Sequence, residues 1–279
     1  MIVRDIKQAK FSIKLAIFNL TSKKISSALI DAKNRGLDVK VITESSNLES
    51  SGFKELKSAN IAVLEDGVSY SLMHNKFMVI DNRLLWSGSA NYSDFSFYRN
   101  WENFIRVEKD DIATLYSNEF DEIVSNLKEV DVYNKSGLEV YFSPDDNFKS
   151  RVLELINSAT SSIKILAYSF TDKDIANALI DAKDRGVKVK VIVDGKWSDN
   201  VYSKDEYLQD YGVDLKRFYS SSILHDKVII VDKNITVTGS YNFTESANSR
   251  NRENSIIVHN SLAAKLYIEE FNKIYAKSR

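Results

Sequence analysis

Cysteine is absent from this chain, and histidine and proline are scarce. Among 279 residues there are no cysteines, three histidines and one proline. The lack of cysteine excludes disulfide bonds and thiolate metal sites, and it leaves the cellular compartment open. Two of the three histidines belong to the repeated motif described below, which leaves too few for a histidine-rich zinc site. We therefore expect no metal and no other cofactor.

Long apolar runs and a surplus of either charge are also missing. No run approaches the roughly 18 apolar residues of a membrane span. Residues Met1 to Asp5 do not read as a signal peptide, so the sequence leaves open the cytoplasm or, if a signal peptide was removed, the periplasm or the exterior. The net charge is −1 and the isoelectric point is about 6.4. Nucleic-acid binders usually show a basic surplus, so only local clusters could support that partner.

What the chain does contain is an internal duplication. With 43% hydrophobic residues it can build one large core or two smaller ones. Residues 12–45 and 162–195 align at an offset of 150, with 18 identities in 34 positions. Each copy predicts a strand, a helix and a second strand, which is a crossover unit with a parallel strand pair. The expected elements are strands at 13–20 and 163–170, helices capped by Thr21 and Thr171 and ended by Gly36 and Gly186, and strands at 39–42 and 189–192.

Two stretches, 74–91 and 225–242, share a second pattern around a short apolar strand. The matching residues are His74, Lys76, Asp81, Gly88, Ser89 and Asn91 in the first stretch, and His225, Lys227, Asp232, Gly239, Ser240 and Asn242 in the second. Side chains two residues apart on a strand share a face, so the histidine and the lysine point the same way, as do the serine and the asparagine. One histidine, one fixed cation and two small hydrogen-bonding groups suit an anionic, tetrahedral ligand.

The aspartates of the pattern are predicted to be structural. Asp81 and Asp232 each follow the lysine by five residues, an odd spacing that turns them to the opposite face of an uninterrupted strand. Asn82 and Asn234 lie close behind them, which is typical of a hairpin turn. Gly88 removes a side chain where a backbone or a ligand could approach closely.

The repeated pattern resembles the signature of the phospholipase D superfamily, His-x-Lys, four residues, Asp, six residues, Gly-Ser-x-Asn. Both copies match every position of this signature. The segments 99–103 (Arg-Asn-Trp-Glu-Asn) and 250–254 (Arg-Asn-Arg-Glu-Asn) are similar to the acidic element that follows the signature in the small bacterial nucleases of the family. Through the duplication, the resemblance covers nearly the whole chain.

The resemblance implies an α/β fold of two homologous repeats packed about a pseudo-twofold axis. Each repeat is expected to be a mixed, largely parallel β-sheet flanked by helices. We expect the first repeat at residues 1–130 and the second at 137–279, joined by a polar linker near Lys128 to Gly137. A predicted strand at 138–144 has no counterpart in the first repeat, which aligns only from Met1 on. We therefore expect that the chain as given starts inside its first repeat.

Together, the residue types and the resemblance predict a metal-independent phosphodiesterase. If the repeats place His74 and His225 on opposite sides of one phosphorus, a neutral imidazole can attack while the protonated one donates to the leaving oxygen. Since the unperturbed histidine pKa is about 6.5, both forms exist near neutral pH. Attack gives a phosphohistidine, which water then hydrolyses. In two-copy family members the N-terminal histidine is commonly the nucleophile, which implies attack by His74 and proton donation by His225.

The other matched residues are expected to support these steps. Their roles would be charge balance for Lys76 and Lys227, hydrogen bonds to the phosphate for Ser89, Asn91, Ser240 and Asn242, and orientation of the imidazoles through the second ring nitrogen for Glu102 and Glu253. His259 belongs to no repeated pair and is expected to be an exposed residue near the end of a strand. Because both copies lie in one chain, a monomer suffices for a complete site.

The signature does not distinguish nucleic acid from phospholipid, and the family hydrolyses both. The short chain, the similarity to small nucleases and the aromatic residues beside the first site favour a nuclease acting on single-stranded DNA, double-stranded DNA or RNA. These aromatics are Tyr92, Phe95, Phe97, Tyr98 and Trp101, interleaved with Arg99. Hydrolysis of phospholipid head groups is the alternative, since a lipid chain could use the same apolar wall. A non-catalytic binding module is a third interpretation, and strand preference and the exo- or endonucleolytic mode stay open.

Overall fold

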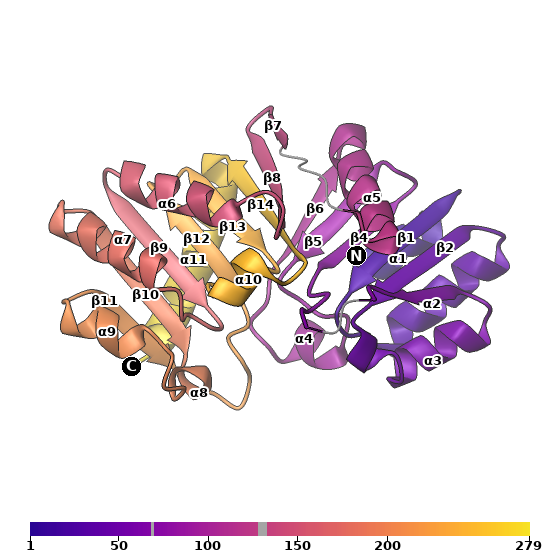
Figure 1. Cartoon of the computed structure of the whole chain (residues 1–279), viewed down its shortest axis with the longest axis horizontal. Coiled ribbons are helices and arrows are strands. Elements are labelled where there is room, and N and C mark those ends of the chain that lie inside the picture. The colour runs from indigo at the N-terminus through magenta and orange to yellow at the C-terminus, as the bar shows by residue number, and fades with distance from the viewer. Residues whose placement is uncertain (68–69, 128–132) are drawn as a thin grey trace.

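The computed structural model describes residues 1–67, 70–127 and 133–279, and it shows two halves side by side (Figure 1). Each half contains one β-sheet with helices on both faces, which confirms the α/β fold of two repeats. The first sheet has six strands in the order β3-β2-β1-β4-β5-β6 within the described residues. They are β1 (Ser12–Ile17), β2 (Asp38–Thr43), β3 (Ala62–Glu65), β4 (Lys76–Ile80), β5 (Leu84–Gly88) and β6 (Phe104–Glu108).

The second sheet repeats this order and adds two strands at one edge. Its order in the described part of the chain is β11-β10-β9-β12-β13-β14-β8-β7. The strands are β7 (Tyr133–Lys135), β8 (Leu138–Ser143), β9 (Ser162–Ala167), β10 (Lys188–Asp194), β11 (Asp214–Phe218), β12 (Lys227–Val231), β13 (Ile235–Gly239) and β14 (Glu253–His259). The apolar strands β4 and β12, which follow the two histidines, are buried at every position and lie inside their sheets, as expected for strands covered on both faces.

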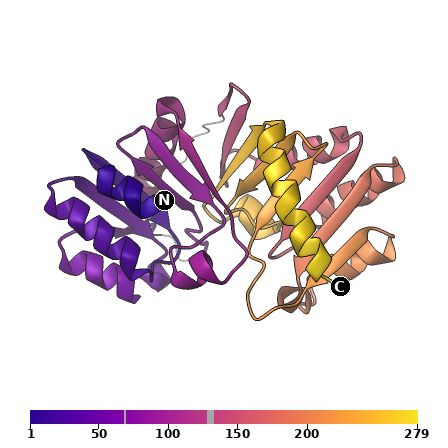
Figure 2. The same cartoon turned by 180° about the vertical axis from the view of Figure 1, so that it is seen from behind.

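Helices cover both faces of each sheet. The first half contains α1 (Ile2–Gln8), α2 (Lys23–Asn34), η1 (Ser45–Asn47), α3 (Ser51–Ser58), α4 (Asp94–Tyr98) and α5 (Asp110–Ser125), and the second contains α6 (Phe148–Ser158), α7 (Lys173–Asp184), α8 (Gly195–Ser198), α9 (Asp205–Asp210), α10 (Glu245–Ser249) and α11 (Ser261–Lys277). The core under α5 includes Val140, Phe142 and Ile256 of the second half, so buried apolar contacts join the halves. Helices α6 and α7 cover one face of the second sheet (Figure 1), and α11, the yellow C-terminal helix, runs across its other face (Figure 2).

The sheets are mixed, as predicted, but they are not largely parallel. Parallel pairing is limited to β1 with β2, β2 with β3, and their counterparts in the second half. Strand β4 runs antiparallel to β1, and β5 and β6 follow antiparallel to their neighbours. The parallel pairs are joined by helical crossovers and the antiparallel pair β4–β5 by a tight hairpin, whereas β5 and β6 are antiparallel across a longer connection that contains α4.

The helix after each first strand begins one residue later than predicted. The N-caps are Ser22 and Asp172, so the expected capping by Thr21 and Thr171 is wrong. The Asp172 carboxylate accepts two backbone N–H groups of the first turn, at 2.9 and 3.0 Å, which is the better cap because the ionised acceptor also complements the helix dipole. Thr21 instead donates its backbone N–H to the Tyr92 carbonyl at 3.0 Å.

The predicted linker near Lys128 to Gly137 lies only partly within the described residues. Residues 128–132 fall outside them, while 133–135 form β7, which pairs antiparallel with β8. The predicted strand at 138–144 corresponds to β8, and it pairs with β14. The repeat boundaries at 130 and 137 stay predictions.

Asp81 and Asp232 have the structural role predicted for them. Both adopt a left-handed conformation, with φ of 55° and 48°, in the hairpin turns after β4 and β12. Asp81 accepts the backbone N–H groups of residues 10–12 at 2.7 to 2.9 Å. Asp232 accepts the N–H groups of residues 160–162 and two hydroxyls at 2.8 to 2.9 Å. Each carboxylate therefore fixes the entry into the first strand of its repeat.

His259 ends β14, as predicted, but it is not simply exposed. It is half-buried, and its Nε2 lies 2.6 Å from the Glu139 carboxylate, which also binds Arg151 and the Tyr141 hydroxyl. These partners hold the pKa of Glu139 down to about 2 although burial alone would raise it. His259 therefore belongs to a buried ion-pair cluster. No described helix is long and apolar enough to span a bilayer.

Candidate active site

Each histidine of the repeated pattern is tied to the other half through its backbone. The His74 N–H donates to the Arg252 carbonyl at 3.0 Å, and the His225 N–H donates to the Trp101 carbonyl at 2.9 Å. Both histidines precede a central strand at the edge where the parallel strands end, because β4 and β12 run antiparallel to β1 and β9. The two motifs therefore lie at the junction of the halves.

Each imidazole is held by a glutamate from the opposite half. The His74 Nδ1 lies 2.8 Å from Glu253 Oε2, and the His225 Nδ1 lies 2.8 Å from Glu102 Oε2. All four side chains are at most 11% exposed. Because a carboxylate only accepts, Nδ1 is the protonated nitrogen and Nε2 is left for a ligand. The folded chain thus brings together all four of these residues, and the pairing between halves was not predicted.

The two serines hold these glutamates. Ser89 Oγ donates to Glu102 Oε2 at 2.7 Å, and Ser240 Oγ donates to Glu253 Oε2 at 2.6 Å. In this structure each hydroxyl donates to a carboxylate, and hydrogen bonding of the serines to a phosphate stays a prediction. The serines therefore act on the imidazoles through the glutamates.

The glycines before the serines allow the next strand to approach. A Cβ on Gly88 would lie 2.2 Å from the Asn103 carbonyl oxygen, and one on Gly239 would lie 2.1 Å from that of Asn254. Their φ values of +147° and +152° also favour glycine. The predicted close approach to Gly88 is confirmed, and the approaching group is the backbone of the neighbouring strand.

Lys76 and Lys227 place two cations inside the junction. They are 1% and 2% exposed, and each Nζ donates to the carbonyl of the preceding histidine, at 2.8 and 2.6 Å. Burial lowers the pKa of Lys76 to about 7 and that of Lys227 to about 8, although the two glutamates oppose this. Among the described residues, no group of three or more histidines, cysteines or carboxylates could hold a metal ion. Lys76 and Lys227 are positioned to supply positive charge at the junction.

Burial and the lysines also act on the imidazoles. Burial lowers the pKa of His74, with Glu253 opposing, and burial, Lys227, Lys76 and the charge on His74 lower the pKa of His225 well below its ordinary range. That the charge of one imidazole affects the other shows that they share one electrostatic environment. A bound phosphodiester anion would oppose these shifts and favour protonation of one histidine.

The two glutamates are not equivalent. Glu253 has both oxygens bonded, because the Asn251 Nδ2 donates to Oε1 at 3.2 Å while His74 and Ser240 occupy Oε2. Glu102 Oε1 is buried without a hydrogen-bond partner among the described residues. Burial accordingly raises the pKa of Glu102 with Lys227 opposing, whereas for Glu253 the effect of burial is outweighed by His74 and Lys76, which lower its pKa.

The asparagines that end the signature each have an amide oxygen without a hydrogen-bond partner among the described residues. Asn91 and Asn242 are half-buried, and the Oδ1 of each is buried. An unpartnered buried amide is unfavourable unless a ligand completes it. Because Oδ1 only accepts, a hydrogen bond to an ionised phosphate would have to come from Nδ2, and this contact stays a prediction.

Two asparagines that we did not assign lock the halves together. The Asn254 Oδ1 accepts the backbone N–H of Lys76 at 2.8 Å, and the Asn103 Nδ2 donates to Asp226 Oδ1 at 2.7 Å. Burial raises the pKa of Asp226 to about 7, with Asn103 opposing and Glu102 reinforcing the shift. Their matched place in the two Arg-Asn-x-Glu-Asn segments was a signal that could have identified both asparagines.

The aromatic residues after the first signature divide into two groups. Tyr92 is buried in the core and cannot stack a base, while Phe97 packs against it and is partly buried. Phe95 and Tyr98 are 64% and 65% exposed. Trp101 is partly exposed and lines a cavity, described below. Of these five aromatics, Tyr92 is therefore excluded from contact with a substrate.

Comparison with known proteins gives a consistent picture. The family model described as "Cardiolipin synthase, PLD-like domain" matches residues 2–124 and 152–275. A phospholipase D from Rickettsia prowazekii is 34% identical over 146 residues, which cover 52% of this chain and 71% of that protein. A mitochondrial cardiolipin hydrolase from Xenopus tropicalis is 32% identical over 130 residues, covering 47% of this chain and 62% of that protein. The crystal structure of a phosphatidylserine synthase from Haemophilus influenzae matches the whole chain and 84% of that protein, with a TM-score of 0.79 and 13% identity, which shows a shared fold.

Proposed function

The chain belongs to the phospholipase D superfamily and is therefore a phosphodiesterase, and we propose that it hydrolyses one phosphodiester between the two histidines at the junction of its halves. The observation that supports this most strongly is the crossed pairing of His74 with Glu253 and of His225 with Glu102, both at 2.8 Å through Nδ1. It fixes two imidazoles with equivalent orientation and leaves both Nε2 atoms for chemistry.

The proposed reaction has two displacements. One Nε2 attacks phosphorus, the bond to the leaving oxygen breaks, and the other histidine gives that oxygen its proton. Water then attacks the phosphohistidine, with the second histidine accepting a proton. Lys76 and Lys227 stabilise the charge on the non-bridging oxygens, and this proposal needs no metal ion. Attack by His74 and proton donation by His225 stay the assignment that the family resemblance implies.

We propose nucleic acid as the substrate class, with single-stranded DNA, double-stranded DNA and RNA as the forms to compare. Exposed rings next to cations support this choice: Arg99 lies 5.2 Å from the Phe95 ring centre, and Lys277 lies 4.8 Å from that of Trp101. Phospholipid is the second candidate, because the relatives named above carry the names phospholipase D and cardiolipin hydrolase. One chain supplies both halves, so we propose that a monomer is active.

The test compares His74→Ala, His225→Ala and, as the matched control, His259→Ala. Each is assayed with single-stranded DNA, duplex DNA, RNA and phosphatidylcholine vesicles, with EDTA present throughout. We expect the first two variants to lose at least about 10³-fold in turnover of nucleic acid, while His259→Ala stays active. Turnover of phosphatidylcholine but of no nucleic acid would show that the substrate is a phospholipid. Activity that requires an added divalent ion would refute the mechanism.

The same variants distinguish an enzyme from a binding module. If the chain only binds its ligand, His74→Ala retains binding and the wild type shows no turnover. To assign the two histidines, bis(p-nitrophenyl) phosphate is useful because p-nitrophenolate is a weak base that leaves without a proton. The variant that lacks only the proton donor should still release a burst of p-nitrophenolate, and we expect this for His225→Ala.

A further inference from the structure

The two histidines are flanked by rings at equivalent positions, 150 residues apart. The Phe18 ring lies edge-on to His74 with centroids 5.3 Å apart, and the Tyr168 ring lies edge-on to His225 at 4.5 Å. The residues next to these two rings are not equivalent. Trp197 packs against Tyr168 at 5.1 Å and is 43% exposed, whereas the equivalent position in the first half is Asn47.

The equivalence of Trp197 and Asn47 is structural as well as sequential. Both belong to a short helical turn after the second strand of their repeat, α8 and η1. In both halves the acidic residue before that turn binds the loop that leads to the histidine: Asp194 accepts the Leu224 N–H at 2.9 Å, and Glu44 accepts the Met73 N–H at 2.8 Å. One scaffold thus presents an exposed indole against Tyr168, the ring that flanks His225, and a small amide against the backbone of Phe18, whose ring flanks His74.

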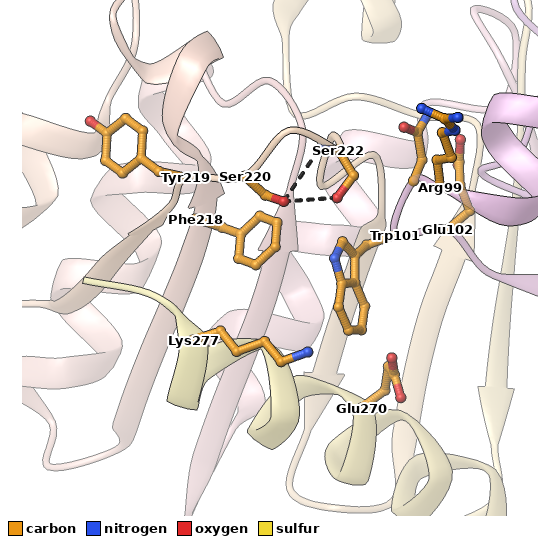
Figure 3. Close-up of a pocket in the computed structure, with 10 residues that line it drawn as sticks. Arg99, Trp101, Glu102, Phe218, Tyr219, Ser220, Ser222, Glu270 and Lys277 are labelled. Carbon is orange, nitrogen blue, oxygen red and sulfur yellow. Dashed lines mark hydrogen bonds between the residues drawn. The ribbon is translucent and has the colours of Figure 1, made fainter.

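The exposed rings continue from Trp197 along the second half. The ring of Tyr219 packs on Gly195, where an added Cβ would lie 2.6 Å from it, and Arg279 lies 4.8 Å from the ring centre. Tyr219 also lines a cavity of about 560 Å³, together with Trp101 and Lys277, and this lining includes the carboxylates Glu102 and Glu270 as well as the cation Arg99. Figure 3 shows Lys277 reaching from α11 toward Trp101. No ion pair joins Lys277 to a carboxylate in the described part of the chain.

The opposite flank of the site lacks these rings. The positions equivalent to Trp101 and Lys277, at an offset of 151, are Arg252 and Asn126. They touch each other in the same way, since the Arg252 guanidinium donates to Asn126 Oδ1 at 3.1 Å, but Arg252 is 4% exposed. The fold therefore builds both flanks alike, but the first-half flank has one exposed ring, Tyr70, beside Arg250 and Arg252, and no counterpart of Trp197.

We propose, on the basis of the phosphodiesterase function above, that Trp197, Tyr219 and Trp101 form a one-sided stacking track for a single-stranded nucleic acid next to the scissile phosphate. Aromatic faces bind unpaired bases of any sequence, and neighbouring cations bind the phosphates between them. In a duplex the base faces are already stacked. The crossed His-Glu pairs are nearly twofold symmetric, so a strand could enter in either direction, and the track on one flank selects one.

The test uses short oligonucleotides with a single cleavable phosphodiester, the other linkages being methylphosphonates. An abasic nucleotide is placed directly 5′ or directly 3′ of the cleavable bond. For wild-type protein we expect an abasic nucleotide on one flank to lower kcat/KM about tenfold and on the other flank to change it little. In Trp197→Ala the oligonucleotide kcat/KM, taken as a ratio to that for bis(p-nitrophenyl) phosphate, falls about tenfold, and the sensitivity to the abasic nucleotide disappears.

Asn47→Ala is the matched control, because it truncates the equivalent residue of the first half; we expect it to keep the wild-type response to both abasic substrates. Equal sensitivity on both flanks, or a Trp197→Ala variant that keeps the wild-type response, would overturn the track. A wild-type protein that hydrolyses bis(p-nitrophenyl) phosphate but no nucleic acid would instead refute the proposed nuclease function. Loss of binding to phosphatidylcholine vesicles on Trp197→Ala, with oligonucleotide cleavage intact, would assign the ring to a lipid surface, since Val201 and Tyr202 nearby are 89% and 70% exposed.

Discussion

Replacing each active-site glutamate with glutamine should have unequal effects, although the repeats are homologous. In Glu253→Gln a neutral amide replaces a carboxylate that accepts three hydrogen bonds, from His74, Ser240 and Asn251. The amide NH2 would also face the Asn251 Nδ2 donor, and Asn251 cannot turn without losing its bond from the Leu72 N–H. Weakening one charge-assisted bond and opposing another should cost about 3 kcal/mol, or roughly 150-fold in kcat.

Glu102→Gln should be milder. Glu102 Oε1 accepts no fixed hydrogen bond in the described part of the chain, and the Ser96 hydroxyl that acts on Glu102 can rotate to accept from an amide NH2. We expect about 1 to 2 kcal/mol, or roughly 5- to 30-fold in kcat.

The assay is the steady-state kcat for bis(p-nitrophenyl) phosphate at neutral pH, with thermal unfolding of both variants recorded in parallel. The thermal measurement separates a chemical effect from loss of folded protein. A Glu102→Gln variant as impaired as Glu253→Gln, at equal thermal stability, would refute the reasoning from hydrogen-bond partners.

Three further predictions follow from the same geometry. Since Lys76 and Lys227 have pKa values of about 7 and 8 instead of 10.5, the free enzyme loses positive charge over this range, and kcat/KM for an anionic diester should fall above about pH 7; a profile flat to pH 10 would contradict this. Asp232→Ala should lower the free energy of unfolding by about 3 kcal/mol in denaturant titrations, because five hydrogen bonds to the carboxylate are lost. Backbone and hydroxyl donors outweigh burial and hold the pKa of Asp232 below 3.8. The stabilisation by this carboxylate is therefore present above pH 3.8 and is lost as the pH falls further. An Asp232→Ala variant with the same denaturant midpoint as the wild type would contradict this prediction. Gly239→Ala, whose Cβ would lie 2.1 Å from the Asn254 carbonyl, should abolish activity, whereas Gly36→Ala, with no atom within 4 Å, should cost only about 1 kcal/mol; similar activity in both would refute the close approach.

The fold and the set of site residues could be predicted because the same sequence pattern occurs twice in the chain. The duplicated strand, helix and strand fixed the crossover units, and the spacing from His74 to Asn91 indicated a hairpin. Strand direction was misjudged in part: the hairpin at Asp81 and Asn82 was predicted, but the parallel crossover units were taken as typical of the whole sheet. The helix cap was placed one residue early, since Thr21 and Ser22 are both chemically able to cap.

Contacts between the halves could not be derived from the sequence. That Glu253 serves His74 and Glu102 serves His225 depends on how two homologous units pack, and local periodicity carries no information about packing between them. The same is true of the hydroxyls of Ser89 and Ser240, whose spacing suits a ligand as well as a carboxylate. His259 was misjudged for a related reason, because its partner Glu139 lies 120 residues away.

The most direct test of a shared site is the number of phosphoryl groups that one chain can bind covalently. Wild-type protein is mixed rapidly with excess bis(p-nitrophenyl) phosphate, quenched at alkaline pH, and analysed by intact mass. If the two imidazoles act on one phosphorus, no chain acquires more than one phosphoryl adduct, and none forms in the variant that lacks the attacking histidine. Chains with two adducts, or single-histidine variants that each keep about half of the turnover, would show that the halves work as separate sites.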